Sequence, residues 1–513
     1  MSIVEPDVDV AIIGAGIAGI GLGIRLRRRG DRSFVIFERA RQPGGTWRDN
    51  TYPGVACDVP SHLYSYSFRP NPAWSGFFAP GHEIQRYLLA SAAEEGLDEN
   101  IRLNTHIAGA RWDADHAHWV LESSGGSVTA RVLVLAAGRL SNPRYPAVPG
   151  LDSFPGPAFH SARWDHDVDL TGKRVAVVGS GASSVQIVPE VARVASHLSV
   201  LQRSAPYVIP RANPEYTAAE RTLLDRDPAE LARLRAALFW KAEEAYAQRA
   251  AEPQALDAAR SRALDHLHAQ VADTTLRAKL TPSYEIGCKR VLISSEYYPA
   301  LTQPHVRLEA SALAAVEGNT LVMANGTRHD ADVVILATGF HAAEQPYAAT
   351  IVGRDGVTLA EHWAQGMTAF ASTAVSGFPN MFVINGPNAA VGHNSAIYMI
   401  EAQIDYILGA LQYQRAEGDP VLAVTAEAER SYVKVIDELS ASTVWMTGRC
   451  DSWYLDPRSG RLTLLWPDFA FAFRERNGRF SADAYETVAR EVSSLERRLA
   501  SDERPAGETQ LPS

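Results

Sequence analysis

Apolar residues follow two kinds of pattern along the chain. Predominantly apolar runs, typical of buried parallel strands, lie at 8–13, 34–37, 131–140, 174–178, 198–201 and 331–340. Between 214 and 280 apolar residues instead recur at spacings of three and four, which predicts amphipathic helices. Strand runs that alternate with helical stretches favour an α/β fold with parallel sheets.

The first strand run leads into Gly14-x-Gly16-x-x-Gly19, a helical stretch and a second strand that ends at Glu38. Glycines at this spacing let the backbone approach a pyrophosphate at a helix N-terminus. An acid at the end of the second strand can accept hydrogen bonds from a ribose. The motif therefore predicts a dinucleotide site; the alternative is a glycine-rich turn without a ligand.

A second copy of this motif begins at Gly179 and Gly181, with Ser184 at the third small position. The spacing from Gly14 to Glu38 is 24 residues, and 24 residues after Gly179 stands Arg203. An acid suits a free 2′-hydroxyl, whereas arginine suits a 2′-phosphate. The first site is therefore predicted to hold FAD or NAD, and the second NADP. The alternative for Arg203 is a solvated surface arginine.

The runs at 131–140 and 331–340 end in glycine turns and are typical of strands that return to each sheet after an excursion. The fold class predicted is α/β, with two Rossmann-like dinucleotide-binding domains, for FAD and NADP, and a helical insertion. Residues 1–150 would form the first part of the FAD domain, and 151–213 with 281–340 the NADP domain. Residues 214–280 would be the insertion, and 341–513 the second part of the FAD domain with the C-terminal region.

Composition sets limits on this picture. The chain has 513 residues, 46% of them hydrophobic and 21% charged, with a net charge of −10, so no global charge favours nucleic acid or an anionic membrane. The uncharged run from 10 to 24 is too short to span a bilayer. The three cysteines Cys57, Cys288 and Cys450 lie far apart and are interpreted as free thiols of a reducing, cytoplasmic compartment; no metal site is expected.

Several further stretches resemble those of a known family. "GGTWRDNTYPGVACD" (44–58) resembles the flavin loop of class B flavin-dependent monooxygenases. "FPGPAFHSARWD" (154–165) is similar to the Phe-x-Gly-x-x-x-His-x-x-x-Trp fingerprint of type I Baeyer–Villiger monooxygenases. "IGCKRVLISSEYYPAL", "ILATGF", "GFPNMFVINGPN" and "SWYLD" also resemble blocks of that family, in the same order. Ser184 departs from the pattern by replacing a glycine with another small residue.

The resemblance implies roles for individual residues. Arg290 would be the active-site arginine beside the flavin, with Asp58 orienting it, and Trp453 would face the nicotinamide. His160 and Trp164 would lie in the linker that couples domain motion to cofactor binding. The flavin would be lined by Gly45, Thr46, Trp47, Asp58 and Tyr64, and NADP held by Ala182, Ser183, Ser184, Arg203, Ser204 and Lys289.

Other interpretations of these residues stay open. Asp58 can be a turn residue that follows Tyr52-Pro53-Gly54, and Lys289-Arg290 a solvated basic pair. His160 can be a structural histidine and Trp164 a core residue.

The activity implied is an FAD-dependent monooxygenase that consumes NADPH and O2 and converts a small-molecule ketone to an ester or lactone through a C4a-peroxyflavin. One alternative is an N- or S-oxygenating enzyme of the same scaffold. The other is a non-oxygenating NADPH oxidase or redox flavoprotein. A disulfide reductase is set aside because the three cysteines offer no close pair. Neither nucleic acid nor membrane is expected as a partner, and the substrate and the oligomeric state are left open.

Overall fold

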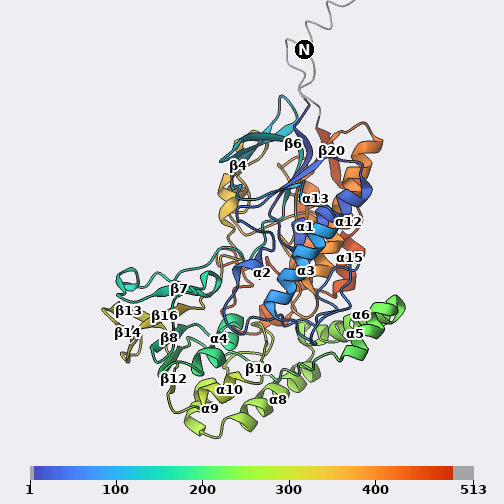
Figure 1. Cartoon of the computed structure of the whole chain (residues 1–513). Coiled ribbons are helices and arrows are strands. Elements are labelled where there is room, and N and C mark those ends of the chain that lie inside the picture. The colour runs from blue at the N-terminus through green and yellow to red at the C-terminus, as the bar shows by residue number, and fades with distance from the viewer. Residues whose placement is uncertain (1–4, 489–513) are drawn as a thin grey trace, which may run out of the picture.

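The computed structural model describes residues 5–488 and contains two sheets with parallel strands at their centres (Figure 1). The larger sheet has the strand order β17-β4-β5-β6-β1-β2-β3, with β18 also paired to β6. Its strands are β1 (Val8–Ile13), β2 (Phe34–Phe37), β3 (Ile101–Arg102), β4 (Ile107–Asp113), β5 (His118–Ser123), β6 (Gly126–Leu135), β17 (Ile351–Val352) and β18 (Met381–Val383).

The centre of this sheet follows the apolar runs of the sequence. β1 pairs in parallel with β2 and β6, and β2 is buried along its whole length. The run at 131–140 was predicted as one strand, but β6 starts earlier, at Gly126, and ends at Leu135. It starts earlier because its first half pairs antiparallel with β5 before its second half joins β1.

Three helices cover one face of this sheet: α1 (Ile17–Arg29), α3 (Gly81–Glu94) and α12 (Ala396–Ala416). They lie side by side in Figure 1, although α12 begins 367 residues after the end of α1 in the chain. Apolar residues of β1, α1 and α12 form one buried cluster. The apolar run from 10 to 24 is thus a strand, a turn and the start of a helix.

The second sheet has the order β12-β9-β8-β16-β7, with all of its pairs parallel. Helices α4 and α10 pack together beside it (Figure 1). The elements are β7 (Ala158–His160), β8 (Arg174–Val178), α4 (Ala182–Ala192), β9 (His197–Leu201), α10 (Tyr297–Leu301), β12 (Val306–Glu309) and β16 (Val333–Leu336). A small antiparallel sheet follows β12, made of β13 (Leu313–Glu317), β14 (Thr320–Met323) and β15 (Arg328–Asp330).

Five helices occupy the stretch with helical spacing, as the pattern predicts. They are α5 (Ala218–Arg226), α6 (Pro228–Glu243), α7 (Tyr246–Arg249), α8 (Pro253–Gln270) and α9 (Thr274–Leu280). α8 packs against β10 (Val208–Ile209), which pairs with β11 (Leu292–Ile293) on the way back to the sheet. α6 also reaches the larger sheet's part of the molecule, because Arg235 donates to the Ser65 hydroxyl at 2.7 Å.

The C-terminal part packs on the larger sheet and on α12. Its elements are α11 (Leu359–His362), β19 (Val421–Val424), α13 (Ala426–Ser440), α14 (Val444–Thr447), α15 (Ala470–Asn477) and β20 (Tyr485–Val488). Residues 489–513 of the predicted C-terminal region lie outside the described residues. Among residues 5–488, the longest helices are either too short or too polar to cross a bilayer.

Candidate functional site

The two glycine loops have the same construction. The Gly14 N–H donates to the carbonyl of Phe37 at 2.8 Å, and the Gly179 N–H to the carbonyl of Leu201 at 2.9 Å. Both glycines have positive φ, +108° and +124°. A Cβ would lie 2.6 Å from the Ala136 oxygen at Gly14 and 2.3 Å from the Ala337 oxygen at Gly179. Only glycine fits either turn, and a helix N-terminus, of α1 or α4, follows each.

The two copies of the motif differ at its third small position. At Gly19 a Cβ would lie 1.9 Å from the Gly14 oxygen, so the first loop requires glycine there. In the second copy Ser184 takes this position and is fully buried at the start of α4. The second turn thus accommodates a small side chain where the first does not.

The loop at 44–58 lies over the first glycine loop. The Gly44 N–H donates to the Ala15 carbonyl at 2.8 Å, and a Cβ at Gly45 would lie 3.1 Å from the Gly16 Cα. At Gly181, the counterpart of Gly16, a Cβ would meet no heavy atom of residues 5–488 within 4 Å. The first loop is therefore covered by protein and the second is open. Thr46 and Trp47 begin the short helix α2 (Thr46–Asp49) that continues from this cover.

Glu38, the predicted ribose acceptor, is buried at the end of β2. Its carboxylate accepts hydrogen bonds from the backbone N–H of Ala15 at 3.1 Å and of Ala40 at 2.9 Å. It also pairs with Arg48 at 2.9 Å. Arg48 was not predicted from the sequence, although it stands two residues after Thr46 in the quoted flavin loop. Glu38 therefore ties the glycine loop and the loop above it together.

Asp58 and Arg290 meet although 232 residues separate them. Arg290 Nε and Nη2 donate to the same carboxylate oxygen, Asp58 Oδ2, at 2.9 and 2.6 Å. The negative charge of Asp58 raises the pKa of Arg290 well above its usual value, which burial alone would lower. Arg290 is therefore a permanent cation whose plane is fixed by the carboxylate. The contact that the resemblance implied between these residues is present.

Trp47 and Tyr64 contact each other, and Tyr64 lies close to this pair. Trp47 Nε1 donates to the Tyr64 hydroxyl at 3.2 Å, and the two rings meet edge to face with centroids 5.6 Å apart. Burial raises the pKa of Tyr64 and of the Cys57 thiol, so both groups are neutral. Trp47, from the loop at 44–58, and Tyr64, which follows the loop, thus form a neutral aromatic surface next to one fixed ion pair.

The predicted NADP residues beyond the loop gather at one place. Lys289 Nζ donates to the Ser204 hydroxyl at 3.2 Å. Burial, and then the nearby cation Arg203, lower the pKa of Lys289. The Arg203 side chain is 71% exposed and lies 3.4 Å from Asp451. Two cations and a hydroxyl therefore lie at the open end of the second glycine loop, a donor set that suits a phosphate. Ala182 and Ser183 form the first turn of α4 beside them.

His160 and Trp164 lie where the chain enters the second sheet. His160 Nδ1 accepts from the Ala162 N–H at 3.1 Å, so the proton is on Nε2, which donates to the Gly339 carbonyl at 2.9 Å. Burial lowers the pKa of His160 to about 4, which keeps the ring neutral. Trp164 packs edge to face on Phe159 with centroids 5.2 Å apart. His160 thus joins the incoming strand β7 to the outgoing turn after β16.

The cysteines correct the sequence interpretation. Cys288 and Cys450 form a disulfide, with Cα atoms 6.2 Å apart, and only Cys57 is free. The prediction of three free thiols is wrong because a sequence separation of 162 residues conceals the pairing that the fold produces. The absence of a close pair can therefore no longer serve to set aside a disulfide reductase. The bond joins the residue before Lys289 to the residue before Asp451.

A cavity of about 390 Å³ opens beside the Asp58–Arg290 pair. Helices α7 and α8 of the insertion form one wall, with Arg249 and Gln248 from α7, and Gly392 to Asn394 form another. None of these cavity residues was predicted individually from the sequence. Tyr454, a buried neighbour of Arg290 and Arg249 in the quoted "SWYLD" block, was not predicted either. Trp453, predicted beside the nicotinamide, is 45% exposed and its ring lies 4.5 Å from that of Tyr454.

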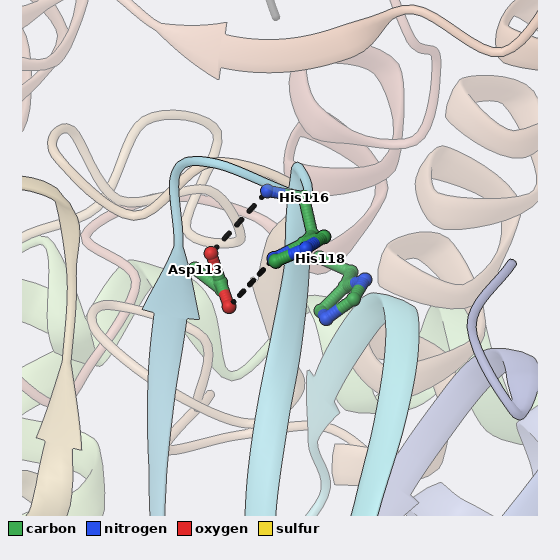
Figure 2. Close-up of side chains that lie close together, drawn as sticks. All are labelled: Asp113, His116 and His118. Carbon is green, nitrogen blue, oxygen red and sulfur yellow. Dashed lines mark hydrogen bonds and ion pairs between the residues drawn. The ribbon is translucent and has the colours of Figure 1, made fainter. Parts of the chain in front are cut away.

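A separate cluster lies at the turn between β4 and β5, where Asp113, His116 and His118 bring ligand-type atoms within 4.8 Å of one another (Figure 2). The Asp113 carboxylate accepts from the backbone N–H groups of Asp115 and His116 and contacts the His116 ring at 3.1 Å. Burial raises its pKa, but the His116 contacts outweigh that and lower it overall. The carboxylate therefore closes the hairpin turn, and we assign no metal to this cluster.

Comparison with known proteins identifies the family. The family model described as pyridine nucleotide-disulphide oxidoreductase matches residues 11–223, which include both glycine loops. A Baeyer–Villiger monooxygenase of Streptomyces coelicolor is 45% identical, over 94% of this chain and 93% of that protein. The structure of an oxidised steroid monooxygenase bound to NADP is 32% identical with a TM-score of 0.80, over 91% of this chain and 96% of that one. The structure of OTEMO with FAD and NADP is 25% identical with a TM-score of 0.83, over 94% of this chain and all of that one.

The two glycine loops are consistent with the FAD and NADP that these related structures contain. Both loops offer a helix N-terminus without a side-chain cap, and the space beside Gly181 suits close approach of a pyrophosphate. The residues present therefore fit FAD and NADPH. The chain belongs to the Baeyer–Villiger monooxygenase family and is an NADPH-dependent flavin monooxygenase that uses FAD and NADPH.

Proposed function

We propose that this enzyme inserts one atom of O2 beside the carbonyl carbon of a ketone, giving an ester or lactone. One ketone, one O2, one NADPH and one proton are consumed, and the ester, NADP⁺ and one water are released. The observation that carries the proposal is the ion pair between Arg290 and Asp58 at 2.6 Å, in the wall of the cavity. When bound, FAD supplies the oxygen chemistry, through the C4a-peroxyflavin expected for the family.

In this proposal Arg290 stabilises negative charge on the reacting oxygen atoms and on the tetrahedral adduct of the ketone. It suits that task because it is cationic at any working pH and because Asp58 fixes its plane. The neutral surface of Trp47 and Tyr64 beside it excludes water from the flavin. Asp58 is a positioning residue, which acts through Arg290.

The remaining predicted residues complete the proposal. Gly14, Gly16, Gly19, Glu38, Gly45 and Thr46 bind FAD, and Gly179, Gly181, Ala182, Ser183, Ser184, Arg203, Ser204 and Lys289 bind NADPH. The proximity of Arg203, Ser204 and Lys289 supports the second assignment. Trp453 lies on the nicotinamide side, and His160 and Trp164 couple motion of the two domains through the linker.

The test compares the wild type with Arg290→Ala on a panel of cyclic, aryl and linear ketones and a thioether, with products identified by mass spectrometry. We expect esters from the wild type. In Arg290→Ala, FAD should stay bound and reducible by NADPH while ester formation falls by roughly 10²–10³, the effect of losing one preorganised charged donor. NADPH would then be consumed slowly, with hydrogen peroxide as the product.

Asp58→Asn is the matched variant, because it keeps the shape and removes the charge beside Arg290. We expect a smaller loss of ester formation than in Arg290→Ala. Normal ester yield in Arg290→Ala would remove Arg290 from the reaction. Sulfoxide from the thioether with no ester from any ketone would favour an S-oxygenating enzyme, and peroxide alone from the wild type would favour an NADPH oxidase.

A further inference from the structure

Arg249 differs from its neighbour in the cavity, Arg290, in how its charge is balanced. Arg290 pairs with Asp58 at 2.6 Å. Arg249 is buried, and the hydrogen bonds that it makes go to two neutral oxygens, the side-chain oxygen of Gln248 and the Gly392 carbonyl, the latter at 3.1 Å. Within residues 5–488, no carboxylate forms an ion pair with Arg249. A buried cation without a counter-charge is costly unless a bound anion balances it.

The surroundings of Arg249 disfavour its positive charge and do not balance it. Its charged neighbour is another cation, Arg290, and burial is the main cause that lowers the pKa of Arg249, to about 10. It nevertheless stays cationic at neutral pH. Gln248, the next residue along α7, turns its oxygen to Arg249, so its Nε2 is a further donor, without an acceptor among the described residues. This wall of the cavity is therefore rich in donors.

Two glycines make room for the guanidinium. A Cβ at Gly287 would lie 3.0 Å from Arg249 Nη1, and a Cβ at Gly392 would lie 3.1 Å from Arg249 Nε. Any side chain at these positions would have to displace Arg249. The charge is thus held in the cavity wall by three separate segments: the insertion, the chain before Lys289 and the chain before His393.

We propose that Arg249 binds a carboxylate of the substrate, so that the preferred substrate is a ketone that carries an anionic group away from its carbonyl. This inference rests on the proposed function, since it places the carbonyl at Arg290 in the same cavity. A cavity of about 390 Å³ has room for both groups of one small molecule. The phosphates of NADPH are the other anions available, but the cations predicted for them, Arg203 and Lys289, gather beside Ser204 instead.

The test uses 4-oxocyclohexanecarboxylate and its amide, which share the ring and the carbonyl and differ in charge. The holoenzyme with FAD and NADPH is assayed for lactone by mass spectrometry. We expect kcat/KM for the acid to exceed that for the amide by roughly 10- to 150-fold, the range for hydrogen bonds to a charged group. In Arg249→Met this preference should disappear, and KM for NADPH should stay the same.

Two further variants keep the result interpretable. Arg249→Lys retains the charge and should retain part of the preference, which shows that loss in Arg249→Met is not loss of folding. Arg233→Met removes an exposed arginine of α6, in the same insertion but paired with Glu230, and should leave the preference unchanged. Equal kcat/KM for acid and amide in the wild type would overturn the proposal. A raised KM for NADPH in Arg249→Met, with the preference kept, would also overturn it, by assigning Arg249 to the coenzyme.

A binding measurement separates this inference from the proposed function. Calorimetric titration of the oxidised enzyme, loaded with FAD and NADP⁺, with 4-oxocyclohexanecarboxylate needs no turnover. We expect binding that weakens by the same roughly 10- to 150-fold in Arg249→Met. If no ketone yields an ester but this binding and its loss are seen, the proposed reaction fails and the anion site stands. If esters form but the acid binds no better than the amide, the reaction stands and the anion site fails.

Discussion

The two glycine loops share a backbone but differ in what lies above them. At Gly14 and at Gly179 the glycine N–H donates to a carbonyl at the end of the following strand. A Cβ at either glycine would also clash with a backbone carbonyl. A Cβ at Gly16, however, would contact the Cα of Gly45, whereas a Cβ at Gly181 would meet no heavy atom of residues 5–488 within 4 Å. A covered site suits a coenzyme that stays bound through many turnovers, and an open one suits a coenzyme that enters and leaves. The difference supports the proposed assignment of FAD to the first loop and of NADPH to the second.

The residues 24 positions after Gly14 and Gly179 also differ: the first is buried and the second is exposed. Glu38 is buried and takes part in hydrogen bonds to the glycine loop and an ion pair with Arg48. Arg203 is exposed, and its ion-pair partner, Asp451, is exposed as well. Protein contacts thus fix the acid of the first site before any ligand binds, whereas the second site holds an exposed cation that can change partners.

The largest contrast is expected between Gly14→Ala and Gly181→Ala. Gly14→Ala combines a positive φ, which alone costs about 1–2 kcal/mol, with a Cβ 2.6 Å from a backbone oxygen. We expect little folded protein and no bound FAD. Gly181→Ala has free space for its Cβ and should fold with normal FAD content. Its methyl group should hinder the pyrophosphate and raise KM for NADPH by roughly tenfold, or about 1.4 kcal/mol. Flavin absorbance and steady-state kinetics measure both.

Gly179→Ala is the control for this pair, since its Cβ would lie 2.3 Å from the Ala337 oxygen. It should fail to fold, as Gly14→Ala does, although it belongs to the open loop. Loss of FAD from a well-folded Gly181→Ala, or an unchanged KM for NADPH, would contradict the proposed difference between the loops.

The second prediction concerns the buried pair of the covered site. Arg48→Ala leaves Glu38 buried without its counter-charge, and breaking a buried pair in this way costs about 3–5 kcal/mol of unfolding free energy. The measurement is denaturant unfolding of the holoenzyme. Arg193→Ala, which removes an exposed arginine at the end of α4 paired with Glu190, should cost less than about 1 kcal/mol. Equal losses of unfolding free energy in the two variants would show that burial of the Glu38–Arg48 pair adds nothing to its contribution to stability.

Much of this comparison is visible in the sequence, for a physical reason. Strands β1, β2 and β8 have the predicted bounds because a predominantly apolar run that ends in a turn specifies a buried parallel strand locally. The fixed spacing from Gly14 to Glu38 and from Gly179 to Arg203 reflects one strand-turn-helix-strand unit used twice. Family resemblance, not spacing, supplied the partnership of Asp58 with Arg290, which depends on contact between residues 232 positions apart.

The features that were missed are all long-range. The Cys288–Cys450 bond, the approach of Tyr454 to Arg290 and the position of Arg249 in the cavity wall depend on how the insertion and the C-terminal part pack on the two sheets. Arg48 is a partial exception, because it stands in the quoted loop at 44–58. Its pairing with Glu38 nevertheless needs the loop to fold back over β2. Local patterns specify elements, whereas the balance of charge in a site depends on which elements meet.

The third prediction concerns the exposed cation of the open site. Arg203→Ala should reduce the preference for NADPH over NADH by roughly 10- to 150-fold, since a hydrogen bond to a charged group contributes about 1.5–3 kcal/mol. FAD content and kinetics with NADH should not change, because NADH lacks the 2′-phosphate. Arg193→Ala, an exposed arginine at the other end of α4, serves as the control. If Arg203→Ala keeps the preference for NADPH over NADH, Arg203 is a solvated surface residue that does not bind the 2′-phosphate.

The smallest effect is expected at Asp451, which lies 3.4 Å from Arg203 and follows Cys450 of the disulfide. If Arg203 binds the 2′-phosphate, the Asp451 carboxylate competes with that phosphate for the same guanidinium. An exposed pair of this kind contributes about 0.2–1 kcal/mol. Asp451→Asn, which keeps the side-chain shape, should therefore lower KM for NADPH by a factor between about 1.4 and 5.

Two features distinguish this competition from a general change at the surface. KM for NADH should stay the same, and the gain for NADPH should disappear at about 1 M salt, where the Debye length falls to about 3 Å. A rise in KM for NADPH in Asp451→Asn would have the opposite meaning: Asp451 would orient Arg203 for the phosphate, as Asp58 is proposed to orient Arg290. A carboxylate would then preorganise the open site in the same way as Asp58 fixes the plane of Arg290. The contrast between the two glycine loops would be limited to the protein that covers the first.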